Sequence, residues 1–177
     1  FGIKAGVFLL HAWLPKAHAK APGPISALLS GVMLKTGVLG WMQFLSFGQH
    51  GYAFAGAALA LVGLVGIYFG LYGLFVRGLK EVLAYSSVSQ MGYLALLSGT
   101  VLLQPALFAQ AKEAMLFFML HHGMAKAALF LLASGIIKNG RSKATLLLTV
   151  LAAAFLIGLP FTSGAIAKTM LKEHIIV

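Results

Sequence analysis

The sequence feature that most constrains this chain is the run Leu107–Ile137, which is almost wholly apolar yet contains His121, His122 and Lys126. Apolar runs of this length are long enough to cross the hydrocarbon core of a bilayer as helices. An ionisable group deep in such a helix is costly, and by default it marks an ion or proton path. His122 and Lys126 are four residues apart and therefore lie on one helix face, whereas His121 points about 100° away.

The composition agrees with a polytopic membrane protein. The chain is 60% hydrophobic and 9% charged, whereas soluble domains carry about 25% charged residues. The net charge of +10 does not indicate nucleic-acid binding, because the basic residues are scattered singly through apolar runs. The lack of cysteine excludes disulfides and thiolate metal sites, and no soluble-enzyme, cofactor or metal motif is recognisable. We therefore expect no cofactor or metal in this chain.

Six hydrophobic segments predict an all-α polytopic fold with about six transmembrane helices, in a partial transporter domain over residues 1–177. The segments are 1–14, 24–47, 52–76, 82–103, 107–137 and 144–176. The first reads as the second part of a truncated span, so we interpret the chain as a fragment; five or seven crossings are the alternatives. The last should break near Gly158-Leu159-Pro160 and Gly164, because proline removes a backbone donor and clashes with the preceding turn.

The connections between segments predict the orientation. Counted on alternate sides, one side carries seven basic residues: Lys16, Lys20, Arg77, Lys80, Lys138, Arg141 and Lys143. The connections on the other side carry no Lys or Arg before Lys172; they contain Gln49, His50, Gln104 and Pro105. Positive residues collect on the cytoplasmic side of membrane proteins. The basic side is therefore expected to face the cytoplasm, or the matrix or stroma of an organelle.

Lys35 is expected near the middle of the membrane. It lies about eleven residues into its segment, which at 1.5 Å per residue is roughly 16 Å into a ~30 Å hydrocarbon core. A lysine at that depth cannot reach the interface along its own stem. Lys126 is similarly deep, and His122, one turn away, can exchange protons near neutral pH. We predict that these three residues carry protons; the alternative is that backbone carbonyls or lipid headgroups satisfy them.

Lys4 and Lys168 lie inside apolar sequence of the first and last segments, which run in opposite directions. Interrupted helices at matching places in two inverted halves point to a transport site. A helix break also frees backbone groups that need polar partners, so we expect water near Lys168. The fourth segment adds a polar stripe that can either hold water or bond neighbouring helices: Ser86, Ser87, Ser89 and Gln90.

Several stretches strongly resemble the antiporter-like proton-pumping subunits of respiratory complex I (chain 2, 4 and 5 type), membrane-bound hydrogenases and Mrp-type cation/proton antiporters. The similarity covers nearly the whole chain. The stretches are Lys4–Gly6, His11–His18 (HAWLPKAH), Ala21–Leu28 (APGPISAL), Ser30–Gly37, Leu83–Tyr93 (LAYSSVSQMGY), His122–Phe130, and Gly158-Leu159-Pro160 followed by Ser163-Gly164 and Lys168.

The resemblance implies a fold of about fourteen helices with two inverted five-helix repeats and discontinuous helices, of which this chain would cover the end of the first repeat and most of the second. It also implies the order of a proton relay: Lys4, Lys35, Lys126 with His122, and then Lys168. The lysine matching Lys4 would pair with a glutamate on an earlier helix.

Two departures from the family pattern stand out. Leu9 occupies a position where relatives usually have proline, so we expect a weaker break in the first helix. The link Lys138–Lys143 is shorter than in most relatives. Either departure is consistent with a divergent branch or with altered coupling to a neighbouring subunit.

The sequence thus predicts proton translocation by an antiporter-like subunit of an NADH-quinone oxidoreductase- or hydrogenase-type complex, in a bacterial or archaeal inner membrane or an organelle inner membrane. The subunit would perform no redox chemistry itself, since quinone, flavin and iron–sulfur groups would sit in partner subunits; whether it counts as an enzyme is left open. One alternative is Mrp-type Na⁺/H⁺ exchange, although the chain has no Asp and only three Glu to bind sodium. Another is a structural membrane subunit that transports nothing.

Overall fold

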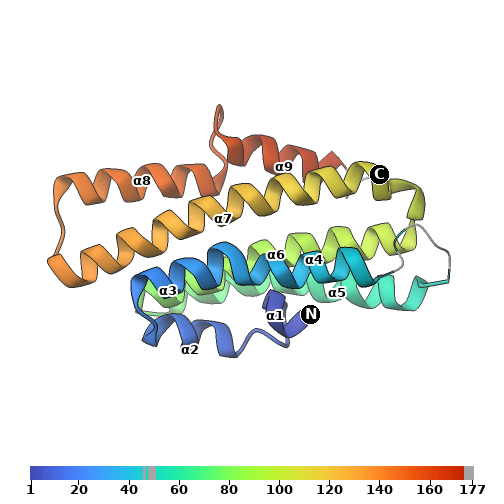
Figure 1. The fold of residues 1–177 in the computed structure, drawn as a ribbon, viewed down its shortest axis with the longest axis horizontal. Coiled ribbons are helices and arrows are strands. Elements are labelled where there is room, and N and C mark those ends of the chain that lie inside the picture. Colours follow the sequence, from blue (N-terminus) through green and yellow to red (C-terminus); the bar gives the residue numbers. More distant parts are fainter. Residues whose placement is uncertain (46, 48–50, 174–177) are drawn as a thin grey trace.

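The computed structural model describes residues 1–45, 47 and 51–173, and within these residues it contains helices and no strand. Long helices lie side by side along one direction (Figure 1). In chain order the elements are α1 (Gly2–Ala5), α2 (Trp13–Lys20), α3 (Gly23–Leu28), the π-helical η1 (Leu29–Met33), α4 (Leu34–Phe44), α5 (Ala53–Phe69), the 3₁₀-helical η2 (Gly70–Phe75), α6 (Leu79–Leu103), the 3₁₀-helical η3 (Pro105–Leu107), α7 (Phe108–Asn139), α8 (Lys143–Ile157) and α9 (Ser163–Glu173).

Four continuous helical stretches in the described residues are long and apolar enough to cross a membrane. They are Gly23–Phe44, Ala53–Phe75, Leu79–Leu103 and Pro105–Asn139. Each corresponds to one predicted segment, so the expectation of an all-helical polytopic membrane protein is confirmed. The total of six crossings stays a prediction. Gln49 and His50, which entered the charge count, and residues 174–176 of the last predicted segment lie outside the described residues.

The first segment is interrupted after a single helical turn. The helix α1 ends at Ala5, and Gly6 caps it in the left-handed conformation with φ 66°. Leu9 is also left-handed, with φ 72°, and helix resumes only at Trp13. A left-handed leucine is strained by about 1–2 kcal/mol. The break is therefore present despite the absence of proline; that it is weaker than in relatives stays a prediction.

The last segment is also discontinuous, as predicted. A capping box between Ser142 and Thr145 starts α8, and Gly158 ends it with φ 80° while its N–H bonds the Ala154 and Phe155 carbonyls. The helix α9 then begins at Ser163. In Figure 1, α8 and α9 follow each other along the length of α7. The break separates the last carbonyls of α8 from any continuing helix, so these carbonyls need other donors.

Helix α6 forms the centre of the described bundle, with a run of side chains that includes Val88, Met91 and Leu94 completely buried. Glycines bring α5 into close contact with it. A Cβ placed on Gly92 would lie 2.7 Å from the Gly63 carbonyl oxygen, so no larger residue fits there without movement. Small residues allow membrane helices to approach in this way.

The basic connections gather at one end of the bundle. The α7–α8 link and the starts of α3 and α6 lie together on the left in Figure 1, and the α6–α7 link lies at the opposite end. The ammonium of Lys80, in the first turn of α6, donates a 2.8 Å hydrogen bond to the carbonyl of Ala21, the residue that follows α2. The predicted charge asymmetry is thus compatible with the helix directions; which side faces the cytoplasm stays a prediction.

Candidate functional site

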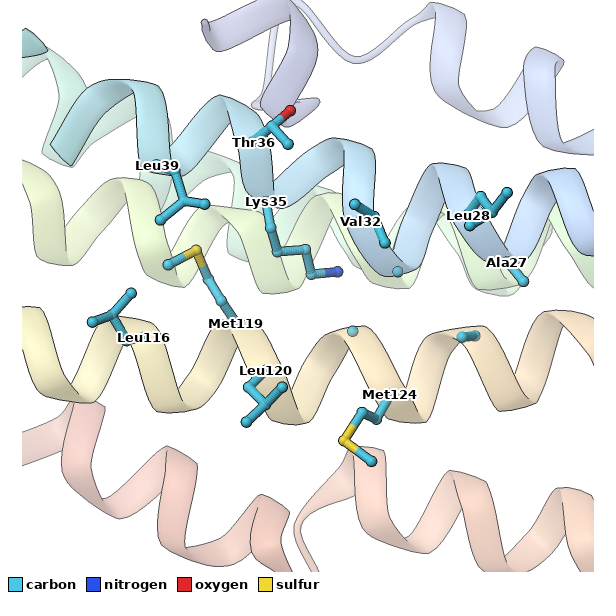
Figure 2. Close-up of a pocket in the computed structure, with 13 residues that line it drawn as sticks. Ala27, Leu28, Val32, Lys35, Thr36, Leu39, Leu116, Met119, Leu120 and Met124 are labelled. Atoms are coloured by element: carbon cyan, nitrogen blue, oxygen red, sulfur yellow. The ribbon is translucent and has the colours of Figure 1, made fainter. Parts of the chain in front are cut away.

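Lys35 lies directly after a local change in helix type. The π-helical turn η1 widens the helix at Leu29–Met33, and such turns occur frequently at functional sites. The Lys35 side chain is buried, and its ammonium donates a hydrogen bond to the backbone carbonyl of Ser30. Figure 2 shows it extending from α4 along the interval between α4 and α7. It lines a cavity of about 490 Å³ there.

A close approach of two glycines sets the separation of Lys35 from α7. A Cβ placed on Gly123 of α7 would lie 2.7 Å from the Gly31 carbonyl oxygen and 3.7 Å from Cε of Lys35. The backbone of η1 therefore touches α7, and the lysine stem lies against the helix that carries His122. The absence of side chains at 31 and 123 is what makes this geometry possible.

Lys126 is completely buried and is held by α6. Its ammonium donates a 2.6 Å hydrogen bond to the Leu83 carbonyl and a 2.5 Å hydrogen bond to the Ser86 hydroxyl. A buried ammonium is costly unless it is hydrogen-bonded, so these partners explain how the lysine is tolerated at this depth. The bonds tie α7 to α6.

Serine side chains connect the partners of Lys126 with the partner of Lys35. The Ser87 hydroxyl donates to the Leu83 carbonyl at 3.1 Å, and it can then accept from the Ser30 hydroxyl, which lies 3.1 Å away. Ser30 in turn supplies the carbonyl that binds Lys35. Two lysines 91 positions apart in the chain are thus linked through contacting polar groups.

We name Lys35, His122 and Lys126 the buried cluster. His122 lies within the buried cluster and is completely buried. Its ring is close enough to Lys35 and Lys126 for both lysines to act on it electrostatically. Neither ring nitrogen has a hydrogen-bond partner among the described residues. The ring is stacked near Phe118, with 6.1 Å between ring centroids. An imidazole between two amines is a chemically suitable proton acceptor and donor.

Lys168 and Lys4 lie outside the buried cluster. Lys168 is half-buried on α9, and its ammonium donates a 2.5 Å hydrogen bond to the carbonyl of Ile157, the last residue of α8. Lys4 is exposed on α1 and takes no part in the contacts that join the other lysines. Its helix packs against α4, because a Cβ on Gly37 would lie 2.9 Å from Ala5 Cα. The structure therefore brings together three of the five predicted residues.

Two further histidines have surroundings that the sequence did not reveal. Nδ1 of His121 lies 2.9 Å from the Ser163 hydroxyl, across the break before α9. His18 of α2 is completely buried and stacks on Phe130 of α7, with ring centroids 4.2 Å apart. Helical spacing shows only that His121 points away from His122, so its partner becomes visible only once α9 is packed against α7.

No set of three or more His, Asp or Glu side chains in the described part of the chain is grouped closely enough to hold a metal ion. The charged groups that the described site presents are amines and imidazoles, held by hydroxyls and backbone carbonyls. Such groups accept and release protons. Carboxylate oxygens, the usual ligands of hard cations, are absent from these contacts.

Comparison with known proteins gives one family. The model of a family described as NADH:quinone oxidoreductase/Mrp antiporter, TM, matches residues 1–175. Formate hydrogenlyase subunit 3 of Escherichia coli (strain K12) is 35% identical over 142 residues, which are 77% of this chain and 23% of that protein. NAD(P)H-quinone oxidoreductase chain 4 2 of Microcystis aeruginosa (strain NIES-843 / IAM M-2473) is 41% identical over 138 residues, 75% of this chain and 23% of its own length.

An uncharacterized protein of Mycobacterium tuberculosis (strain ATCC 25618 / H37Rv) is 33% identical over 196 aligned residues, which cover 99% of this chain and 31% of that protein. The chain thus spans about a quarter to a third of the length of these relatives. The resemblance recognised in the sequence is confirmed.

Proposed function

Because this chain belongs to the NADH:quinone oxidoreductase/Mrp antiporter transmembrane family, we propose that it conducts protons across a membrane by way of buried lysine and histidine side chains. The observation that supports this most directly is the pair of buried lysines, Lys35 and Lys126. Lys35 bonds the Ser30 carbonyl and Lys126 the Leu83 carbonyl, and the hydroxyls of Ser30 and Ser87 connect these two partners. A protein that only held other subunits together would gain nothing from two buried amines beside a buried imidazole.

The relay we propose runs from Lys4 to Lys35, then to Lys126 with His122, and then to Lys168. Its driving principle is electrostatic. Two like charges ~7 Å apart repel by about 2.4 kcal/mol at an effective dielectric constant of about 20. A proton that arrives on one amine therefore favours release of the proton from the next amine. A change of charge at one end of the relay in this way alters the protonation of the residues at the other end.

We further propose that the subunit works inside a multisubunit membrane complex. Two relatives are named as parts of formate hydrogenlyase and of NAD(P)H-quinone oxidoreductase. In such an assembly the redox cofactors would be held by partner subunits, and this chain would contribute only proton movement. A cell inner membrane, or an organelle inner membrane, is the location in keeping with that role.

The second candidate is Na⁺/H⁺ exchange, since the family description includes Mrp antiporters. Sodium prefers oxygen ligands, and the chain has no Asp and three Glu. Protons are the better match to amines and imidazoles. A pH gradient that requires sodium, in vesicles containing the assembled complex, would favour exchange instead.

The decisive experiment measures proton pumping in membrane vesicles that contain the assembled complex with Lys126→Ala or Lys35→Ala. Pumping should fall to background in both variants. Lys112→Ala is the matched control, because Lys112 lies on the same helix as Lys126 but is exposed. Normal pumping by Lys126→Ala with normal assembly would contradict the proposal and favour a structural subunit.

A further inference from the structure

His121 occupies the gap between α8 and α9. Its Nδ1 lies 2.9 Å from the Ser163 hydroxyl. The backbone of Phe155, in the last turn of α8, lies close enough to interact with the ring. A Cβ placed on Gly164 would lie 3.0 Å from His121 Nε2 and 2.9 Å from Gly158 Cα. The His121 ring therefore lies where Gly164 has no side chain.

The hydroxyl partner of His121 suits both protonation states of the ring. When the neutral ring carries its proton on Nε2, Nδ1 accepts a hydrogen bond from Ser163. In the charged ring both nitrogens donate. The hydroxyl of Ser163 can then rotate and accept, because a hydroxyl is both donor and acceptor. The ring can gain or lose a proton and keep its contact with Ser163.

His121 also lies electrostatically between the buried cluster and Lys168. The charge of Lys168 acts on His121, and His121 in turn acts on His122. Lys168 and His121 both lie at the end of α8, where Lys168 bonds the Ile157 carbonyl. His121 lines the same cavity as Phe155 there. No other imidazole among the described residues contacts this break.

We propose that His121 is the relay residue that passes protons between the buried cluster and Lys168, and that Ser163 is its positioning residue. The inference rests on the proposed function. In the transfer step, an N–H bond of the His121 imidazolium breaks and an N–H bond forms on the neutral amine of Lys168. The products are neutral His121 and the Lys168 ammonium, so one proton moves and charge is conserved.

The alternative is that His121 only fastens α7 to the break through its hydrogen bonds. His121→Gln separates the two roles, because a glutamine amide can hydrogen-bond Ser163 but cannot titrate. If His121 relays protons, His121→Gln should lower pumping about a hundredfold with normal assembly, in line with what a positioned acid–base group contributes. Pumping at the wild-type rate would overturn the inference.

Imidazole rescue provides a second readout. His121 and Ser163 line a cavity of about 540 Å³ between α7 and α8, which can admit a small molecule. In His121→Ala, added imidazole should restore part of the pumping, and ethanol or another neutral solute should not. A structural role gives no such selectivity, so equal effects of imidazole and the neutral solute would count against the relay.

Ser163 supplies the test if the histidine variants fail to assemble. Ser163→Ala removes the acceptor that the charged ring needs and should slow pumping, while Ser163→Thr keeps a hydroxyl and should pump faster than Ser163→Ala. Thr169→Ala is the matched control, since Thr169 bonds a carbonyl of its own helix α9. Normal pumping by Ser163→Ala would overturn the inference. Normal pumping by Lys126→Ala would instead contradict the proposed function itself. The failure of the His121 inference and the failure of the proposed function can therefore be told apart.

Discussion

The ammonium of Lys126 donates a 2.6 Å hydrogen bond to the backbone carbonyl of Leu83 on the neighbouring helix α6. The same carbonyl accepts from the Ser87 hydroxyl, which contacts Ser30 beside Lys35. A single carbonyl on α6 is thus the point where the environments of two buried lysines meet. The polar stripe recognised on this helix bonds neighbouring helices at these positions.

Ser87→Ala should slow proton transfer between the two lysines. The change removes the hydroxyl that links Ser30 to the Leu83 carbonyl, but leaves both amines in place. Loss of one hydrogen bond costs about 1 kcal/mol, which corresponds to about fivefold in rate. Ser98→Ala is the control, because Ser98 is an equally buried serine of α6 that bonds only its own helix, at Leu94. Equal pumping rates in the two variants would argue against the serine link.

Gly123→Ala should disturb the approach of η1 to α7. The added Cβ would lie 2.7 Å from the Gly31 carbonyl oxygen, so the two helices must separate and carry Lys35 away from His122. Overpacking of this kind costs about 1–3 kcal/mol of stability. Gly135→Ala on the same helix meets nothing within 4 Å, and it should be neutral or stabilise by up to about 1 kcal/mol. Thermal unfolding in detergent measures the stability of both variants. If Gly123→Ala were as stable as the wild type, the contact between Gly31 and Gly123 would not be tight.

His18 should make stability fall in acid. Burial, followed by the charges of Lys126 and Lys80, lowers the pKa of His18 from 6.5 to about 4. The unfolded chain therefore binds a proton at higher pH than the folded chain. This contribution to stability is fully present above pH 6.5 and is lost as the pH falls toward 4, by about 3 kcal/mol in all.

His18→Gln provides the comparison, because it removes the titrating ring and leaves the other groups unchanged. Thermal unfolding between pH 7.5 and pH 4.5 should show a shallower loss of stability for His18→Gln than for the wild type. Parallel curves would mean that the buried ring of His18 does not control this dependence.

Gly158→Ala should damage the break between α8 and α9. Gly158 needs a positive φ of 80°, and a Cβ there would lie 2.9 Å from the Gly164 carbonyl oxygen. Gly135 of α7 has open space around it and serves as the control. Gly158→Ala should cost about 1–3 kcal/mol more than Gly135→Ala because of overpacking, in addition to the strain of a left-handed alanine. Gly158→Ala should also lower pumping, since His121 lies at the same break. Equal stability of the two variants would contradict the expected overpacking.

The sequence alone predicted the parts of this protein that depend on one segment at a time. Length and hydropathy predicted the spanning helices, proline and glycine located the break after Ile157, and depth along a helix marked Lys35 and Lys126 as buried. These features are properties of a single helix in a bilayer, so they can be read without knowing its neighbours.

The tertiary structure alone decided which polar groups meet. The helical period places His121 and His122 on different faces, but only the packing of α9 gives His121 the hydroxyl of Ser163. The left-handed Leu9 breaks the first helix where no proline is present. Contacts between helices depend on close approaches such as that of Gly31 and Gly123, which join residues far apart in the chain. No single-segment pattern contains that information, because it arises only when the helix faces are packed together.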